Sequence, residues 1–543
     1  MSSIPPEEAP LRSRPAASPR SASALAPLAV PEFRLLWSTW LAANLSMWMS
    51  DVAAAWTMTS LTSTPIWVAL VQSASTLPVF LLGLPSGALA DILDRRRWLI
   101  ATQVWLAATA ALLCAVTAAG LMTAPLLLVL VFANGIGLAL RWPVFAAIVP
   151  ELVPRQQLAS ALALNGMAMN LSRIVGPLVA GALIASAGSV WVFALNAVLS
   201  LLSAFVILRW RHEREASPLG RERLISAMRV GVLFVRQSPR MRAVLLRVSI
   251  FFLHSTAVLA LLPLLARGLA GGDAGTFTLL LACMGAGAIV SVLVLPRFRQ
   301  AYGRDQLVVG GTLVQSAATV AMALAPSAWV AVPAMVAAGM AWITVANSLS
   351  VSAQMSLPNW VRARGMASYQ MAIMGASALG AALWGQVATV GTMQTALLSA
   401  AASGILMMLL AVRFVSDSAD EEADLSPARA GWAAQPSWVA PQEGGRVLTT
   451  IEYLIDPARA EAFELTMQET RRARLSEGAI GWELLHDIRE PGRFVEQVID
   501  ESWTEHLRRF HRATAADLAL RERRLAFHQG EEPPRISRYV VRR

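Results

Sequence analysis

The chain has 543 residues, of which 56% are hydrophobic and only 15% are charged, and its formal net charge is +10. Because soluble domains carry about 25% charged residues, this composition excludes an ordinary soluble enzyme and indicates an integral membrane protein. The positive charge does not indicate binding to nucleic acid, because the basic residues are spread over short connections between apolar stretches.

Residues 1–32 are rich in proline, serine, alanine and arginine and lack the apolar core of a signal peptide, so we expect a disordered cytoplasmic tail. Twelve apolar stretches fill residues 33–414, from Phe33–Leu61 and Pro65–Ala90 to Ala363–Thr389 and Thr392–Val412. Each can cross a bilayer core, which takes roughly 20 residues. The predicted fold class is an all-α membrane protein with twelve transmembrane helices as two six-helix bundles, followed by a small α+β ferredoxin-like soluble domain.

Arginines occupy alternate connections between these stretches. They are Arg95, Arg96, Arg97, Arg155, the run from Arg209 to Arg247, Arg297, Arg299, Arg304, Arg362 and Arg364. The other connections carry no basic residue, and only Arg267 lies near one of their ends. The positive-inside rule therefore predicts a multi-pass protein with both termini in the cytoplasm. We expect the protein in a bacterial-type inner membrane.

The longest connection divides the spans into two bundles at residues 33–210 and 243–414, joined by a cytoplasmic linker at 211–242. The bundles echo each other, because Val153-Pro154-Arg155 and Trp360-Val361-Arg362 occupy corresponding positions. Such a repeat of six spans in one orientation predicts two bundles related by an axis along the membrane normal.

Two motifs carry a family resemblance. The segment after the second span reads Gly87-Ala88-Leu89-Ala90-Asp91-Ile92-Leu93-Asp94-Arg95-Arg96-Arg97. It resembles the signature loop of the major facilitator superfamily, G-x-L-a-D-r-x-G-R-r, and departs from it at Ile92 and Asp94. Gly176-Pro177-Leu178-Val179-Ala180-Gly181 in the fifth span is similar to the G-P-x-x-x-G element of the superfamily's antiporters.

The resemblance covers residues 33–414 and implies a secondary active transporter, similar to bacterial siderophore and macrolide exporters. Its partners would be a small, partly hydrophobic substrate, protons and membrane lipid. Asp91 would latch the inner gate by facing the helix that begins near Ala363, whose N-terminal dipole favours an anion. The arginines Arg95–Arg97 either pair across the cleft or serve only as a topology signal. Gly176 and Pro177 mark either a moving hinge or ordinary tight packing.

Charged residues inside the spans are the candidate transport groups. Asp51 lies about 27 Å along the first span at 1.5 Å per residue, and a buried carboxylate there is costly unless it is protonated, paired or wetted. We predict it as the proton-coupling group. Arg173 in the fifth span binds an anionic substrate or, as we slightly prefer, pairs with Asp51. His254 is a candidate proton relay. Arg141 either binds substrate or extends its charged end to the inner interface of the membrane.

The composition changes after Phe414, and we expect a linker at residues 415–445 and a soluble domain at 446–543. Val447–Ile455, Ile480–Ile488, Phe494–Glu501 and Ile536–Val541 are predicted strands, and Pro457–Leu475 and Thr504–Phe527 are predicted helices. The order β-α-β-β-α-β resembles the antibiotic-monooxygenase type of ferredoxin-like domain. His506 and His511 do not share one helix face closely, so we interpret their helix as a basic face on a dimerising module.

The alternative function is a membrane-anchored enzyme or ligand-binding protein that acts through this C-terminal domain. We expect no enzyme activity and no cofactor, and the soluble domain shows neither a metal-ligand constellation nor a reactive cysteine. The absence of a P-loop argues against direct coupling to ATP.

Overall fold

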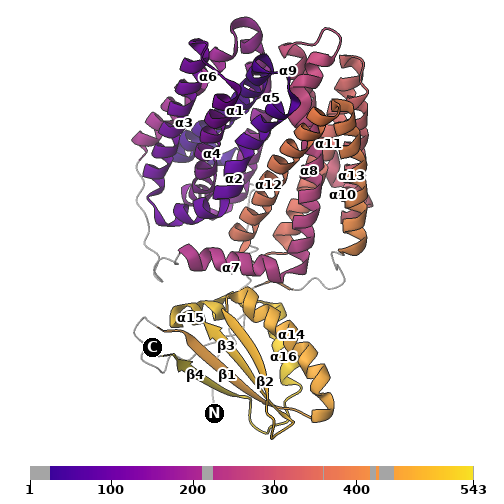
Figure 1. Ribbon diagram of the computed structural model, residues 1–543. Coiled ribbons are helices and arrows are strands. Elements are labelled where there is room, and N and C mark those ends of the chain that lie inside the picture. Colours follow the sequence, from indigo (N-terminus) through magenta and orange to yellow (C-terminus); the bar gives the residue numbers. More distant parts are fainter. Residues whose placement is uncertain (1–24, 211–223, 359, 416–423, 427–444, 542–543) are drawn as a thin grey trace, which may run out of the picture.

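The computed structural model describes residues 25–210, 224–358, 360–415, 424–426 and 445–541. The expected tail therefore lies mostly outside the described residues, and so do most of the expected linkers. Within the described part, two helical bundles stand side by side above a small α+β domain, and one helix lies between them and that domain (Figure 1). We call the end of the bundles near this domain the domain-facing end and the opposite end the far end.

Twelve long helices form the two bundles. The first bundle contains α1 (Pro31–Leu61), α2 (Pro65–Ile92), α3 (Arg95–Ala118), α4 (Ala124–Leu152), α5 (Leu158–Ala187) and α6 (Ser189–Arg209). The second contains α8 (Pro239–Gly268), α9 (Ala274–Ala301), α10 (Arg304–Ala323), α11 (Ala328–Met355), α12 (Arg362–Val390) and α13 (Met393–Phe414). Eleven of the described helices are long and apolar enough to span a membrane. Helix α1 is not among these eleven, but it packs against α5 and α6 inside the first bundle. The predicted fold class is confirmed.

The two bundles share a hydrophobic core only toward the far end. That core takes residues from both bundles, among them Met58, Val68 and Phe193 from the first and Leu261, Phe277 and Trp384 from the second. Toward the domain-facing end each bundle has a core of its own. Phe33, Phe145 and Ile148 belong to one, and Phe251, Leu349 and Tyr369 belong to the other. The bundles also touch in the domain-facing half, where α2 packs closely on α12 and a Cβ atom on Gly83 would lie 2.7 Å from the side chain of Met371.

The C-terminal domain is a four-stranded antiparallel sheet with helices on one side (Figure 1). It comprises β1 (Val447–Leu454), α14 (Ala460–Glu477), β2 (Gly481–His486), β3 (Arg493–Asp500), α15 (Trp503–Arg512), α16 (Ala515–Leu525) and β4 (Arg535–Val540). The sheet order is β2-β3-β1-β4, which is the order of a ferredoxin-like domain. Alternate residues of β1 are buried, and Tyr453 packs against Phe463 of α14 and joins a core with Met467 and Phe494. The predicted α+β domain is confirmed.

One predicted helix of this domain is wrong. The sequence suggested a single helix over Thr504–Phe527, but α15 ends at Arg512 and α16 begins at Ala515. Ala513 is extended, and the Thr514 hydroxyl accepts from the backbone N–H of Asp517 while the Asp517 carboxylate accepts from Thr514. This capping box stabilises a new helix start. The chain therefore turns at this point.

Helix α7 (Leu224–Gln237) lies between the bundles and the soluble domain (Figure 1). It falls inside the segment expected to be a linker, 211–242, whose last residues begin α8. It packs against α2 of the first bundle, α8 and α12 of the second, and α14 of the domain. Arg229 of α7 forms an ion pair with Glu501, and Arg512 of the domain lies 5.2 Å from the ring of Trp360. The domain is thus docked on an element that touches both bundles.

Candidate functional site

Asp51 lies on α1, where that helix faces α2. The hydroxyl of Ser75 donates a hydrogen bond of 3.1 Å to the Asp51 carboxylate. No cation forms an ion pair with Asp51 among the described residues. A carboxylate with a single neutral donor is poorly compensated for the loss of water, so its charged form is costly in this conformation.

Arg173 on α5 does not pair with Asp51, which corrects our preferred interpretation. Its guanidinium donates a 3.0 Å hydrogen bond to the side chain of Asn170, one turn earlier on the same helix. The two helices run in the same direction, and Ser172 of α5 reaches the Leu41 carbonyl of α1. Asp51 is therefore displaced from Arg173 along the helix axes by roughly 14 Å, at 1.5 Å per residue. This offset explains the missing pair.

The antiporter-type motif on α5 makes two close helix contacts. A Cβ atom on Gly176 would lie 2.6 Å from Trp48 Cβ of α1, within the first bundle. A Cβ atom on Gly181 would lie 2.0 Å from the hydroxyl of Thr278 on α9, in the second bundle. Pro177 stands between them inside the helix. The motif thus packs α5 against its own bundle at one glycine and against the opposite bundle at the other.

Arg141 on α4 is buried, which corrects the expectation that it snorkels to the interface. Only 3% of the residue is exposed, and its Nε and Nη2 atoms have no hydrogen-bond partner among the described residues. The guanidinium lies 5.4 Å from the ring of Trp40, which is itself stacked 4.0 Å from Phe145. Cation–π contact compensates only part of the cost of burying a guanidinium. The group is an unsatisfied donor beside aromatic rings.

His254 lies within the second bundle and faces α10 and α13 across a small cavity. Its Nδ1 atom is 2.7 Å from the Ile250 carbonyl, and its ring lies 5.7 Å from that of Trp384. Because a carbonyl only accepts, Nδ1 carries the proton of this bond. The cavity has no lining residue from the first bundle, so the structure does not bring His254 together with Asp51.

The signature loop is described only in part. Gly87 and Asp91 lie in the last turns of α2, and their side chains are outside the described set, so the proposed latch of Asp91 stays a prediction. Asp94, which departs from the family pattern, caps α3 by accepting a 2.9 Å bond from the N–H of Arg97. Arg96 donates to carbonyls at the end of α6, including that of Leu208. Arg96 therefore connects two helices of one bundle. For Arg95 and Arg97, pairing across the cleft and a topology signal both stay predictions.

Sequence reasoning missed the residues that close the far end. Arg267 of α8 donates a 2.7 Å hydrogen bond to the Thr59 carbonyl of α1, and its guanidinium lies 4.6 Å from the Trp56 ring. Trp56 in turn stacks on Phe277 of α9 at 6.0 Å. One indication of this contact was present in the sequence: Arg267 lies near a connection of the set that otherwise carries no basic residue. These contacts join the two bundles at the far end.

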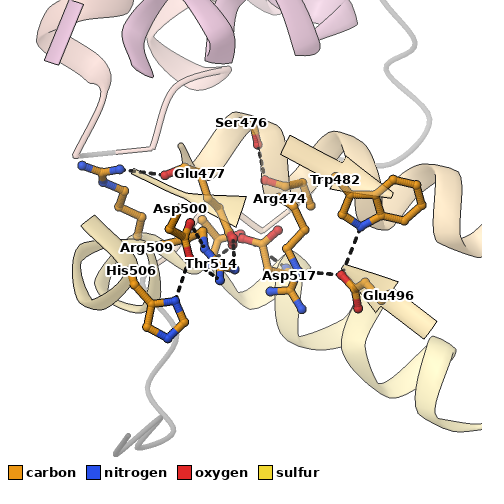
Figure 2. A network of polar contacts seen from close by, with 12 residues as sticks. Arg474, Ser476, Glu477, Trp482, Glu496, Asp500, His506, Arg509, Thr514 and Asp517 are labelled. Carbon is orange, nitrogen blue, oxygen red and sulfur yellow. Dashed lines mark hydrogen bonds and ion pairs between the residues drawn. The ribbon is translucent and has the colours of Figure 1, made fainter. Parts of the chain in front are cut away.

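The soluble domain contains a buried network of charged residues (Figure 2). Glu496 accepts from Arg474, Trp482 and Tyr453, each at 3.1 Å. Burial alone would raise the pKa of Glu496, but Arg474 and Arg524 with these hydrogen bonds lower it to about 2. Each carboxylate oxygen is thus engaged, and the group anchors α14 to the sheet.

The second centre of this network is Asp500. It accepts a 2.6 Å bond from Nδ1 of His506 and two bonds, of 3.0 and 3.1 Å, from Arg509. Burial lowers the pKa of His506, although Asp500 opposes that effect. His506, Arg509 and Arg512 are all buried. The basic side chains of this helix are therefore buried, His506 and Arg509 on Asp500 inside the domain and Arg512 beside Trp360 of the bundles. Of the two histidines of the helix, only His511 is exposed.

Comparison with known proteins places these features in a family. The transmembrane secretion effector family matches residues 22–543. This chain belongs to that family, within the major facilitator superfamily. The chain is 22% identical to the staphyloferrin A transporter of Staphylococcus aureus (strain NCTC 8325 / PS 47) over 47% of its length, and to the macrolide efflux protein A of Streptococcus pyogenes over 49%. These matches span 64% and 66% of the relatives' own lengths.

Solved structures share the fold of the two bundles. The nucleoside transporter NupG superposes with a TM-score of 0.59 at 14% identity, over 70% of this chain and 99% of that structure. At this identity the likeness concerns the fold of the bundles alone.

Proposed function

We propose that this transporter exports a small, partly hydrophobic molecule in exchange for protons by alternating access. The relatives are named as a siderophore transporter and a macrolide efflux protein, which supports export of a siderophore or drug. The arginine-rich connections lie at the domain-facing end, so this end is cytoplasmic by the positive-inside rule, with both termini inside. The observed conformation is then closed to the outside.

Asp51 carries the coupling step. Its single hydrogen bond from Ser75 and its place inside the membrane favour proton uptake when the site is dry. Rocking of the bundles would expose it to water on one side and then the other. Protonation from outside and release to the cytoplasm would drive the substrate in the opposite direction.

The substrate contacts the first bundle near Arg141. A buried guanidinium with unsatisfied donors needs an anionic or acceptor group to offset its burial. Trp40 and its stacked neighbour Phe145 provide apolar surface beside this charge. The site therefore suits a molecule that combines an anionic group with an apolar body.

The deciding experiment measures transport driven by a pH gradient in proteoliposomes, with a panel of fluorescent drugs and one siderophore. Asp51→Asn should abolish coupled movement of the transported compound while leaving its binding intact. Glu32→Gln, on an exposed position of the same helix, is the matched control and should transport normally. Coupled transport by Asp51→Asn at the rate of the control would refute the coupling role.

A further inference from the structure

A small polar cavity lies inside the second bundle, where α8, α10 and α13 meet. Small residues of α13 close one side of it, and every lining residue is buried. Its polar lining consists of six residues, His254 and Ser255 of α8 with Thr312, Gln315, Ser316 and Thr319 of α10. His254 lies midway along α8, so these polar groups stand at a depth in the membrane where each needs a partner.

The polar groups of the lining are unequally satisfied. The hydroxyls of Thr312 and Thr319 donate to carbonyls one turn earlier on α10. Ser255 Oγ and Gln315 Oε1, by contrast, are buried and have no hydrogen-bond partner among the described residues. Because buried polar atoms in proteins are hydrogen-bonded with few exceptions, these two atoms, one on α8 and one on α10, indicate a shared partner in the cavity.

His254 presents a third group of this kind. Its Nδ1–H donates to the Ile250 carbonyl, 2.7 Å away, so Nε2 of the neutral ring is an acceptor. No described residue forms a hydrogen bond to this Nε2 atom. The cavity thus offers an acceptor on His254, an acceptor on Gln315 and a donor hydroxyl on Ser255.

We propose that this cavity binds a water molecule that bridges His254, Ser255 and Gln315. The water would donate one hydrogen bond to Nε2 of His254 and one to Oε1 of Gln315, and it would accept one from the Ser255 hydroxyl. The space is sufficient for about one water molecule. Buried waters make about three hydrogen bonds to groups that otherwise lack a partner, which is the number that this arrangement supplies.

The bridge connects α8 to α10 within one bundle, so it moves with the second bundle as a unit. It also keeps His254 in the neutral form with the proton on Nδ1, which gives this residue a role that requires no change of its charge. No residue of the first bundle lines the cavity. The site is therefore independent of the coupling assigned to Asp51.

Solid-state NMR of the full-length protein in lipid bilayers tests this proposal. The ring nitrogens of the histidines are isotope-labelled, and the transfer of magnetisation from water to each of them is measured. Of the six histidines, only His254 lies in the described helices of the bundles, and the signals that disappear in His254→Gln are assigned to it. Wild type should show a protonated Nδ1 and an unprotonated Nε2 that receives magnetisation from water.

Two variants each remove one partner of the water. Gln315→Leu and Ser255→Ala should each reduce the transfer to Nε2 about fivefold, because one hydrogen bond contributes about that factor to the occupancy of the site. Thr256→Val is the matched control and should leave the transfer unchanged. Thr256 follows Ser255 on α8 and is buried, but its hydroxyl donates to the Phe252 carbonyl and it does not line the cavity.

Three results would overturn the proposal. Absence of transfer from water to Nε2 in wild type would mean that the cavity is dry. A proton on Nε2 in place of Nδ1 would contradict the hydrogen bonds assigned to the ring. An equal loss of transfer in Thr256→Val would assign the effect to a general loosening of α8. The first two results come from wild type alone, so they do not depend on the folding of any variant.

Discussion

At the scale of single residues, Arg141 is a buried group with two guanidinium nitrogens that have no hydrogen-bond partner among the described residues. Arg141→Gln should raise the KM for an anionic substrate by about tenfold to a hundredfold, because a hydrogen bond to a charged group contributes about 1.5–3 kcal/mol. Initial transport rates over a range of substrate concentrations would show the change. The matched control is Arg209→Gln, since Arg209 also lies over an aromatic ring, that of Phe205, but is exposed. If both variants raise KM equally, Arg141 does not contact substrate.

Residues inside the membrane were the hardest to interpret from sequence. The depth of Asp51 followed directly from its position along α1, because the rise per residue is fixed. The side of the helix on which a group lies did not follow, since membrane helices are apolar on most of their circumference and periodicity then gives no orientation. For this reason the burial of Arg141 and the closing contact of Arg267 could not be predicted.

At the scale of elements, the contact between α5 and α9 depends on the absence of a side chain at Gly181. Gly181→Ala would place a Cβ atom against Thr278, and overpacking of this kind costs about 1–3 kcal/mol. The far end should then open more often, by roughly fivefold or more. The measurement is the rate at which a membrane-impermeant reagent labels Thr59→Cys, in a background that lacks Cys114 and Cys283.

The controls for this prediction use the same helices. Gly166→Ala on α5 should have no effect, because no atom lies within 4 Å of the added Cβ. The double change Gly181→Ala with Thr278→Gly should restore slow labelling, since it removes the clash from the other side. Unchanged labelling in Gly181→Ala would mean that the far end closes without this contact.

The soluble domain shows what sequence patterns do and do not determine. The predicted bounds of all four strands agree with the structure to within two residues. Two of them, β1 and β3, alternate buried and half-buried positions, which is the pattern of a strand with one face on a core. The break at Thr514 is not evident from composition, because the residues on both sides of it favour helix, although the sequence holds a capping box there. The inward orientation of His506 depends on Asp500, six residues earlier at the end of β3, and on the angle at which the chain turns from that strand into α15; a helical pattern alone does not give this angle.

At the scale of the whole molecule, we predict that the docked domain restrains the movement of the two bundles through α7. This helix contacts both bundles and the domain, so the bundles cannot rock without moving it or leaving it. The ion pair between Arg229 and Glu501 holds the domain to α7, and both side chains are about one third exposed. An ion pair at such a position contributes up to about 1 kcal/mol. Its loss should therefore shift, but not abolish, docking.

We expect Glu501→Arg to raise the initial transport rate in proteoliposomes by up to about fivefold and to increase hydrogen exchange in α7. The charge swap of Glu501→Arg with Arg229→Glu should return both quantities toward wild type. Glu469→Arg breaks an exposed ion pair with Arg523 elsewhere on the domain and should change neither. If Glu501→Arg instead slows transport and the swap restores it, docking assists the cycle, and the domain acts as an activator of the transporter. If exchange in α7 does not change, the ion pair does not hold the domain, and Arg512 on Trp360 becomes the contact that does.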